Sequence, residues 1–402
     1  MSDLVALEEI AAARTRLRGV IQATPVQPSR AVSAAIGAQT YLKCEHLQRT
    51  GSFKMRGAYN RISVLTPEER ARGVVCASAG NHAQGVALSA QLTATKARVF
   101  MPSGAPLPKI AATRGYGAEI TLVDGGVDEA LAAATSAAER DGAVFVHPFE
   151  HPDIIAGQGT LGLDLIDELP EIGSVVVPIG GGGLIAGVAT AVKAHRPQIS
   201  VIGVQARAAA AVPASLAAGH PVTVPVGDTI ADGIAVARPG ELTLAHIAAF
   251  VDDVVTVSEE DIARAVLLLA ERAKQVVEPS GAAGLAALLA GTGPVAEPIV
   301  VVLCGGNVDP LLLARIIQSG LVSEGRYLDF RTRVPDRPGA LSRLLDQVAR
   351  AGANVVAVEH HRVMPKLGLL EVELQLAVET RGAPHSDELV SILQAAGYPV
   401  QV

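Results

Sequence analysis

Short apolar runs alternate with longer stretches of helical spacing over roughly the first 320 residues. The short runs are apolar on both faces, which is typical of buried parallel strands, and in the longer stretches apolar residues recur three and four positions apart. The predicted strands cover residues 40–44, 74–77, 97–101, 120–123, 144–146, 174–178, 201–205, 254–257 and 298–303. The predicted helices include residues 81–92, 128–140, 184–194 and 259–274, and an alanine-rich run at 206–218 is also expected to be helical. This alternation predicts an α/β fold.

The pattern changes near residues 323–326. The predicted elements beyond this point are a strand (327–334), a turn (335–339), a helix (340–351), two strands (355–363 and 367–378), a helix (386–396) and a short last strand. This βαββαβ order suffices for a small separate domain, because two helices can cover one face of an antiparallel sheet. A chain of 402 residues also exceeds the usual size of a single core. We therefore expect two domains, residues 1–322 and 323–402.

The composition excludes several classes of protein. Hydrophobic residues make up 49% of the chain and charged residues 18%, which is typical of a packed globular protein and excludes a disordered one. The net charge is −7 and aromatic residues make up 3%, so neither a basic surface nor a stacking platform for nucleic acid is expected. The three cysteines, Cys44, Cys76 and Cys304, form no disulfide framework and no metal-ligand spacing, which favours a reducing cytoplasm.

No export signal or membrane span is expected. Acidic residues at positions 3, 8 and 9 precede any apolar run, the reverse of a signal peptide. The stretch 175–192 is uncharged and about as long as a membrane-spanning helix, but Pro178 and the glycines that follow would interrupt such a helix. A strand, a loop and a helix in succession is the better interpretation of this stretch.

Lys54 stands among small and apolar residues in the segment 51–58. Burial lowers the pKa of a lysine, and a lysine of that kind can form a Schiff base or act as a general base. On this segment alone, a surface lysine on the first turn of a helix is an equally good interpretation. Motifs elsewhere in the chain are needed to decide between a surface lysine and a reactive one.

Three further segments each follow a predicted strand. Residues 78–82 open a helix with hydroxyl, amide and backbone donors that would favour a carboxylate, although an ordinary capped turn has the same composition. The glycine run 180–183 costs backbone entropy on ordering, which indicates close approach of the backbone to a ligand such as a small phosphate. A dinucleotide site would instead need an acidic residue where Gln205 stands. Cys304 lies at a strand end, where open α/β sheets bind ligands, although a buried structural cysteine is the commoner case.

Together these segments resemble the pyridoxal-phosphate-dependent threonine ammonia-lyases (threonine dehydratases) of fold type II, over nearly the whole chain. Residues 52–58 look like the cofactor-lysine motif of that family, which implies that Lys54 binds pyridoxal 5'-phosphate covalently. The resemblance implies a cofactor site made by Lys54, Phe53, Asn81, Gly180, Gly181, Gly182, Gly183, Leu184, Glu278 and Cys304. In it Asn81 would bind the 3-hydroxyl, the glycine run the phosphate, and Cys304 would lie beside the pyridine nitrogen. The substrate carboxylate would be bound by Ser78, Ala79, Gly80, Asn81 and His82.

The resemblance also implies the architecture. The catalytic domain would have the tryptophan-synthase-β-like fold, with two parallel-sheet subdomains and the small one, roughly residues 50–150, inserted in the large one. The last residues are similar to an ACT regulatory domain. ACT domains commonly bind amino acids between two copies, which implies a homodimer or homotetramer and feedback by isoleucine or valine, although a domain that only assembles subunits is an alternative. The implied effector residues are Asp336, Pro338, Gly339, Ala340, Leu341 and Asn354.

The implied reaction is elimination of water from L-threonine, followed by hydrolysis to 2-oxobutanoate and ammonia. Lys54 would remove the α-proton, and L-serine would be a second substrate. A serine dehydratase or a serine racemase is the alternative within the family. Racemases carry a serine where this chain has Ala79, and they bind a divalent ion through an acidic residue where it has Gln205, so no metal is expected. An amino-acid sensor without activity would lose Lys54, and a nicotinamide-dependent dehydrogenase would need an acid at position 205.

Overall fold

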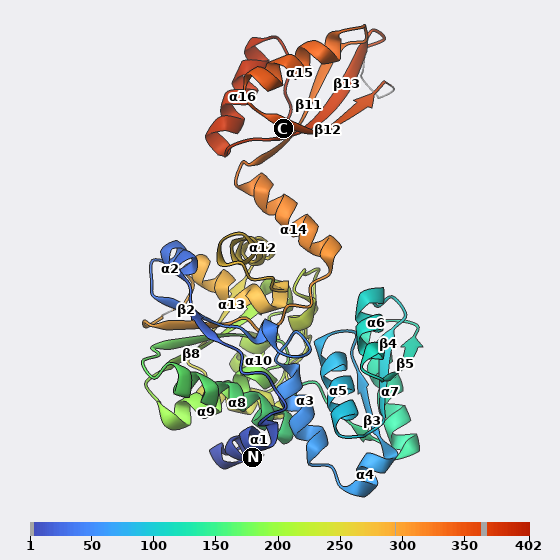
Figure 1. The fold of residues 1–402 in the computed structure, drawn as a ribbon, viewed down its shortest axis with the longest axis vertical. Helices are drawn as coiled ribbons and strands as arrows, with labels where there is room; N and C mark the ends of the chain where they lie inside the picture. The colour runs from blue at the N-terminus through green and yellow to red at the C-terminus, as the bar shows by residue number, and fades with distance from the viewer. Residues whose placement is uncertain (1–3, 294, 363–367) are drawn as a thin grey trace. The chain divides into compact units, whose positions relative to one another are not determined.

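The computed structural model describes residues 4–293, 295–362 and 368–402. The chain divides into two compact units, Met1–Asp309 and Pro310–Val402, and Figure 1 shows the elements of each. The predicted domain boundary, residues 322/323, falls instead at the end of helix α14 (Pro310–Ser323). The structure groups this helix with the C-terminal unit, because its contacts with strand β11 (Tyr327–Pro335) join it to that unit.

A six-stranded sheet organises the first unit, in the order β1-β2-β10-β7-β8-β9. Its strands are β1 (Val26–Pro28), β2 (Thr40–Lys43), β7 (Ser174–Pro178), β8 (Ser200–Ala206), β9 (Asp253–Val257) and β10 (Ile299–Val302). Every neighbouring pair is parallel except β1 and β2. The predicted parallel sheet is therefore confirmed, whereas β1 was not predicted because it has only three residues and ends in a proline.

A four-stranded, wholly parallel sheet lies between β2 and β7 in the sequence, in the order β5-β4-β3-β6. Its strands are β3 (Val74–Ala77), β4 (Ala97–Pro102), β5 (Glu119–Val123) and β6 (Val144–Phe145). Side chains of β3 alternate between its faces: Val74 and Cys76 pack with α5 (Asn81–Leu92), whereas Val75 and Ala77 pack with α7 (Val127–Asp141). Helices on both faces explain why the central strand β3 is apolar and buried throughout.

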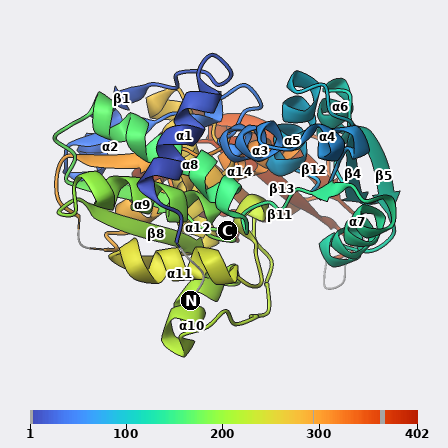
Figure 2. The ribbon, with the colours of Figure 1, turned by 90° about the horizontal axis from the view of Figure 1, so that it is seen from below.

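The remaining helices surround these two sheets. They are α1 (Leu7–Leu17), α2 (Arg30–Ile36), α3 (Lys54–Ser63), α4 (Pro67–Arg72), α6 (Leu107–Gly115), α8 (Pro152–Glu168), α9 (Gly183–His195), α10 (Ala211–Ala218), α11 (Glu241–Phe250), α12 (Glu259–Leu268) and α13 (Pro279–Leu289). Figures 1 and 2 both show α3 beside α5. The predicted helix 259–274 is wrong at its end, because a π-helical turn replaces the α-helix after Leu268 and Lys274 is left-handed, with φ at 60°. The uncharged stretch 175–192 forms β7, a turn and α9, as predicted.

The C-terminal unit contains an antiparallel sheet in the order β11-β13-β12, with two helices on one face. Its further elements are α15 (Ala340–Arg350), β12 (Asn354–His361), β13 (Glu371–Glu379) and α16 (Ala383–Ala395). The predicted order is confirmed, and the last predicted strand is reduced to a single bridge between Arg331 and Gln401. Parts of the two predicted strands that include residues 363 and 367 lie outside the described residues.

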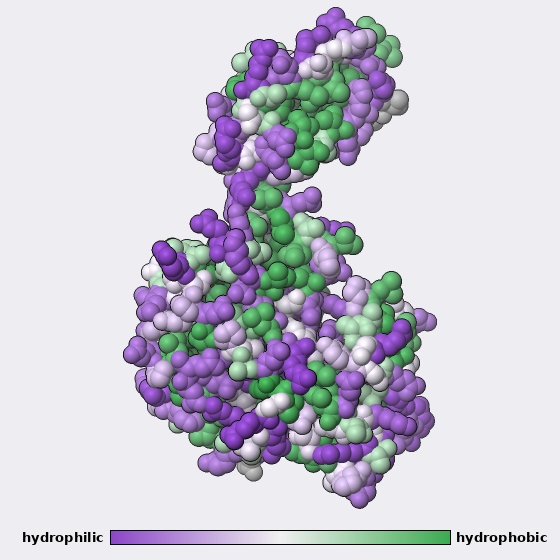
Figure 3. All heavy atoms as spheres, viewed as in Figure 1, coloured by the Kyte–Doolittle hydropathy of each residue, from purple (hydrophilic) through white to green (hydrophobic). Residues whose placement is uncertain are grey.

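Surface character differs along the chain. In Figure 3, apolar surface is visible over α14, in which Leu311 is 72% exposed and Val322 is 50% exposed. Nowhere in the described ranges is there a helix with the length and apolar character that a membrane crossing requires.

Candidate functional site

Lys54 is the first residue of α3 and is only partly accessible to solvent. Its Nζ donates a hydrogen bond to the carbonyl oxygen of Pro148 at 2.9 Å and lies 5.2 Å from the centroid of the Phe53 ring. Desolvation lowers the pKa of Lys54 to about 8, although nearby Cys304 and Glu278 act in the opposite direction. The interpretation as an exposed surface lysine is therefore wrong, and a substantial share of neutral amine is present near neutral pH.

The backbone places this lysine at the end of strand β10. The Phe53 amide donates to the carbonyl oxygen of Cys304 at 3.1 Å, and Ser52 forms an isolated antiparallel bridge with Gly305. The Cys304 side chain is buried, its Sγ lies 3.7 Å from the Ser280 carbonyl oxygen, and burial raises the pKa of its thiol. Cys304 therefore remains a neutral thiol next to the lysine segment.

Asn81, the first residue of α5, belongs to a chain of polar side chains. Its Nδ2 donates to Glu278 Oε1 at 2.6 Å, and its Oδ1 accepts from Asn307 Nδ2 at 2.7 Å. The same Asn307 nitrogen donates to the Thr50 carbonyl oxygen at 2.7 Å. Burial raises the pKa of Glu278 to about 7, because the carboxylate is taken out of water. Asn307 was not among the predicted binding residues, although its place in the loop that follows β10, three residues after Cys304, is the signal that indicates it.

Residues 78–82 form the turn between β3 and α5. The Gly80 amide donates to Ser78 Oγ at 3.1 Å, so the hydroxyl lies at the turn. The His82 ring points elsewhere: it is buried, and its Nε2 lies 2.8 Å from the Val146 carbonyl oxygen. Burial, with a smaller contribution from Lys54, lowers the pKa of His82 to about 3, so the ring stays neutral. His82 contributes only main-chain groups to the turn, since its ring is committed to Val146.

The glycine run connects β7 to α9 and lies against residues next to Lys54. Gly182 has a φ of 98°, which favours glycine, and it precedes the first turn of α9. A Cβ at Gly181 would lie 2.3 Å from the Phe149 ring, and one at Gly183 would lie 2.9 Å from Phe149 Cβ. Phe149 directly follows Pro148, the partner of Lys54. The run and the lysine therefore converge on the same segment, although more than a hundred residues separate them in the sequence.

These residues fit pyridoxal phosphate. Lys54 is partly accessible and has a lowered pKa, as a lysine needs to form a Schiff base with the aldehyde of the cofactor. The amides of the first turn of α9 have no partners within that helix and can bind a phosphate. Ser280 Oγ is buried without a hydrogen-bond partner, and its backbone carbonyl lies beside Cys304. An unpartnered buried hydroxyl costs about 1–3 kcal/mol, which indicates that a polar group belongs next to it. Within the described ranges, His, Cys, Asp and Glu residues form no group of three or more suited to a metal ion.

A buried ion cluster anchors the helix that carries Lys54. Arg56 is fully buried; its Nε and Nη2 each donate to Glu45 at 2.8 Å, and its Nη1 donates to Asp164 at 2.8 Å. Although burial alone would raise the pKa of Glu45, the Arg56 guanidinium lowers it. The sequence motif includes Arg56, but its carboxylate partners could not be identified because nothing in the spacing joins them.

The predicted effector residues of the C-terminal unit do not all meet. Asp336 Oδ2 accepts from Arg362 Nε at 3.2 Å, and the turn ends at Gly339, before α15. Asn354 donates to Glu379 at 3.1 Å. In the sheet register Asn354 pairs with Glu379, whereas Pro335 pairs with Glu371, at the other end of β13. Within one copy, the turn 336–341 and Asn354 therefore lie at opposite ends of the sheet.

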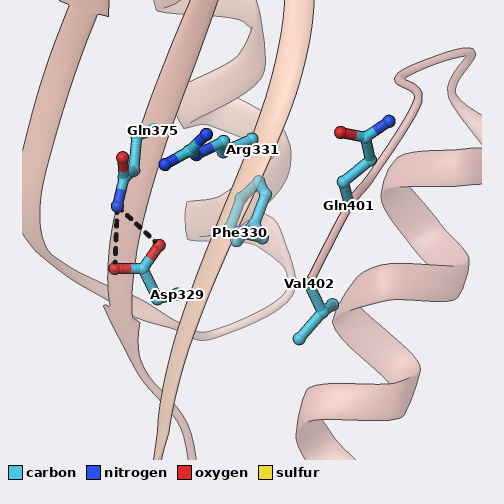
Figure 4. A pocket seen from close by; sticks show the side chains of 6 residues that line it. All are labelled: Asp329, Phe330, Arg331, Gln375, Gln401 and Val402. Atoms are coloured by element: carbon cyan, nitrogen blue, oxygen red, sulfur yellow. Dashed lines mark hydrogen bonds between the residues drawn. The ribbon is translucent and has the colours of Figure 1, made fainter.

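A separate pocket lies on the C-terminal unit. Its lining residues are Asp329, Phe330, Arg331, Gln375, Gln401 and Val402. Figure 4 shows Gln375 beside Asp329, whose two carboxylate oxygens accept from Gln375 Nε2 at 3.0 and 3.2 Å. None of the predicted effector residues lines this pocket.

Comparisons with known proteins agree with this geometry. The pyridoxal-phosphate-dependent enzyme family matches residues 17–305. The chain is similar to a curated L-threonine ammonia-lyase of Thermotoga maritima, with 47% identity over 399 residues, 99% of this chain and 100% of that protein. Its structure is similar to the processed form of threonine deaminase isoform 2 from Solanum lycopersicum, with a TM-score of 0.74, 37% identity, and coverage of 78% of this chain and 94% of that one. It is also similar to maize serine racemase, with a TM-score of 0.73, 36% identity, and coverage of 80% and 100%.

Proposed function

This chain belongs to the family of pyridoxal-phosphate-dependent enzymes, with the α/β architecture of fold type II, and we propose on that premise that it is an L-threonine ammonia-lyase. It eliminates water from L-threonine, and hydrolysis of the released unsaturated amine then consumes one water, so the net products are 2-oxobutanoate and ammonia. The observation that carries the proposal is that Lys54, whose pKa is lowered by desolvation, and the glycine run both contact the segment 148–149. Similarity to an L-threonine ammonia-lyase along the whole chain supports the choice of substrate.

Lys54 is proposed as the residue that holds the cofactor covalently and as the base of the reaction. Pyridoxal phosphate supplies the electron sink that makes loss of the α-proton and of the β-hydroxyl possible. Nζ takes the α-proton as a neutral amine, and its pKa of about 8 is near the operating pH that proton transfer requires. The Pro148 carbonyl and the Phe53 ring keep Nζ in place.

The other predicted residues are proposed to bind the cofactor around this lysine. Gly180, Gly181, Gly182, Gly183 and Leu184 hold the phosphate through main-chain amides, Asn81 binds the 3-hydroxyl, and Phe53, Glu278 and Cys304 line the ring. A thiol whose pKa is raised is not a carboxylate and does not hold the pyridine nitrogen protonated. A neutral thiol at this position would therefore favour the elimination chemistry of the cofactor over transamination.

Substrate recognition is proposed for the turn between β3 and α5. The Ser78 hydroxyl and the main-chain amides of Ala79, Gly80, Asn81 and His82 take the substrate carboxylate at the start of a helix, where an anion is favoured. L-serine lacks only one methyl group of L-threonine, so this site accepts it as a second substrate.

Serine racemisation is the second candidate, because the chain resembles maize serine racemase in structure. Ala79 argues against it, since a methyl group cannot act as an acid or base on the second face of the substrate. Chiral analysis after incubation with L-serine distinguishes the two: pyruvate without D-serine is expected, and accumulation of D-serine would assign the racemase instead.

The C-terminal unit is proposed as an ACT regulatory domain with isoleucine or valine as its effector. Its support is the βαββα order with an antiparallel sheet and the bridge at residue 401. Because Asp336 and Asn354 lie at opposite ends of one sheet, an effector site that uses both needs two copies, so a homodimer or homotetramer is proposed. The cytoplasm is proposed as the compartment, since Cys44, Cys76 and Cys304 are free and buried.

The function is tested by a threonine saturation curve with the cofactor-loaded protein. We expect absorbance at about 410–420 nm, release of 2-oxobutanoate, and a curve that isoleucine or valine shifts. A colourless protein that does not take up pyridoxal phosphate contradicts the enzymatic proposal. A curve that neither amino acid shifts contradicts only the effector proposal, and strong inhibition by EDTA contradicts the expectation that no metal is needed.

A further inference from the structure

We infer that Thr243 and Glu150, two residues outside the predicted site, are positioning residues for the glycine run and set the direction of the main-chain groups that hold the cofactor phosphate. The inference rests on the proposed binding of pyridoxal phosphate. It concerns the residues that orient the phosphate site, not those that touch the phosphate.

Thr243 bonds directly to the glycine run. It is fully buried in the first turn of α11, and its Oγ1 donates to the Gly181 carbonyl oxygen at 2.8 Å. A Cβ at Gly182 would lie 3.0 Å from Thr243 Cβ, so the threonine and the run are in close contact. The same oxygen accepts from the Gly240 amide at 3.0 Å, which fixes the rotamer of the threonine. The Gly240 carbonyl oxygen is a second acceptor for the hydroxyl, at 3.3 Å, and the bond to Gly181 is the shorter of the two.

Peptide geometry converts this bond into an orientation of the next amide. In a trans peptide the carbonyl and the following N–H point in opposite directions across one plane. Because Thr243 holds the Gly181 carbonyl, the Gly182 N–H must point away from α11. Because positions 181–183 carry no side chain and glycine adopts many conformations, contacts from outside the run must fix its peptide planes, and the bond from Thr243 is one of them. Thr243 thus selects one of several orientations.

Glu150 holds α11 in the place that Thr243 needs. Its Oε1 accepts from the Leu242 amide at 2.6 Å and its Oε2 from the Thr243 amide at 3.3 Å, so a carboxylate caps the N-terminus of α11. A Cβ at Gly240 would lie 1.6 Å from Glu150 Oε2, so the helix start and the carboxylate are in direct contact. Glu150 therefore holds the N-terminus of α11 through two direct hydrogen bonds to its main chain.

The same segment reaches Lys54. Glu150 lies two residues after Pro148, whose carbonyl accepts from Lys54 Nζ, and the Glu150 amide donates to His147 Nδ1 at 2.7 Å. Hydrogen bonds, together with the backbone of residues 147–150, thus join the lysine to the glycine run through α11. The two ends of the proposed cofactor would be held at a fixed separation by this connection.

The test compares two ligands on matched variants. Apoprotein is titrated with pyridoxal 5'-phosphate and with pyridoxal, which lacks the phosphate. Thr243→Val removes the hydroxyl at nearly constant volume, and Thr243→Ser keeps it. Thr190→Val is the matched control, since Thr190 is a buried threonine on α9 that bonds Ala186 and His246 and does not touch the glycine run.

We expect Thr243→Val to weaken pyridoxal phosphate binding about five- to tenfold and pyridoxal binding less than about twofold, because one hydrogen bond of ordinary strength is lost at the phosphate end. Thr243→Ser and Thr190→Val should bind both ligands as the wild type does. Glu150→Gln, which loses one acceptor and the charge, should weaken phosphate-dependent binding by a smaller factor. The phosphorus NMR shift of the bound cofactor should move in Thr243→Val and not in Thr190→Val.

Equal losses for both ligands in Thr243→Val would overturn the inference, because the residue would then act on the fold as a whole. Unchanged affinity in a folded Thr243→Val protein would overturn it too. If that variant does not fold, Glu150→Gln decides, and an unaltered ratio of the two affinities in it counts against the inference. A wild-type protein that binds neither ligand refutes the proposed function itself, which is a different result from any of these.

Discussion

The two units arrange their candidate residues in opposite ways. In the first unit, Lys54, Asn81 and Cys304 come from distant segments and lie close together. Cys304 follows the carboxyl end of β10 in one parallel sheet and Asn81 follows that of β3 in the other, and hydrogen bonds join both segments to residues 50–53 or 307. In the C-terminal unit, Asp336 and Asn354 are close in sequence and lie apart. Both β11 and β12 run antiparallel to β13 and start at the same end of the sheet, but Asp336 follows the end of β11 whereas Asn354 begins β12. A parallel sheet can therefore build a site within one copy, whereas this antiparallel unit needs a second copy for a site that uses both residues.

The units also differ in how they place charge. The Arg56–Glu45 pair of the first unit is fully buried, whereas the Arg362–Asp336 pair of the second has side chains 61% and 38% exposed. Burial makes removal of one partner costly, since the other charge is left without compensation. Water screens the exposed pair, so its contribution is small. This contrast predicts different responses to substitution in the two units.

The largest effect is expected at Lys54. Lys54→Ala should abolish absorbance at about 410–420 nm and lower turnover about a thousandfold or more, because covalent attachment and the base are lost together. Lys43→Ala is the control: Lys43 is also buried, but its Nζ bonds Glu168 at 2.7 Å and the Thr24 carbonyl at 2.6 Å. It should keep the absorbance. A coloured, active Lys54→Ala protein contradicts the assignment of the site.

A second test uses the two ion pairs. Arg56→Met should lower the free energy of unfolding by about 3–5 kcal/mol, because Glu45 stays buried without its partner. Arg362→Met should lower it by less than about 1 kcal/mol. Urea unfolding of both variants measures the difference. Similar losses of unfolding free energy in Arg56→Met and Arg362→Met would contradict the prediction that the buried pair contributes more than the exposed pair.

A third test uses pH. Burial lowers the pKa of His82 to about 3 and those of His147 and His246 to about 4. The unfolded chain, with histidine pKa values near 6.5, binds protons that the folded chain does not, so stability should fall as pH decreases from about 6.5 to 4, by up to about 1.4 kcal/mol per pH unit for each histidine. The pKa of Glu278 is raised to about 7, so between about pH 4.5 and 7 the folded chain binds a proton at Glu278 that the unfolded chain does not. This group therefore raises stability as pH decreases and offsets the effect of one histidine.

Urea unfolding of the apoprotein at pH 7, 5.5 and 4.5 measures this dependence. His246→Gln should reduce the slope, because it removes one group whose neutral form is required by its bonds to Val5 and Thr190. A stability that stays constant across this range would contradict the prediction.

The smallest effect concerns the effector. Asp336→Ala and Asn354→Ala should each abolish the shift by isoleucine or valine while leaving turnover without effector unchanged. When the two variants are refolded together, mixed pairs regain one intact site, because the wild-type turn of one copy meets the wild-type Asn354 of the other. Part of the shift should therefore return. Absence of any recovery, with mixed pairs demonstrated, argues against a site shared between copies.

Sequence periodicity predicted most strands, because buried strands such as β3, β7 and β10 are continuous apolar runs and β11 alternates apolar and polar residues. It missed β1, a three-residue antiparallel edge strand, and the π-helical turn after Leu268, whose sequence has helical spacing. The predicted site residues carry local signals such as glycine runs and strand ends. Glu45, Glu150 and Thr243 have no such local signal in the sequence, because their roles depend on partners that are distant along the chain.

The amino-acid sequence by itself determined the α/β alternation, the two-part organisation and the chemistry-bearing motifs, because periodicity and local turn chemistry are properties of neighbouring residues. Only the tertiary structure decided that Lys54 is desolvated beside Pro148, that Arg56 lies against Glu45, and that Thr243 holds Gly181. It also decided that Asp336 and Asn354 lie at opposite ends of a sheet. Desolvation and long-range hydrogen bonds depend on groups that are far apart along the chain, so no local pattern specifies them.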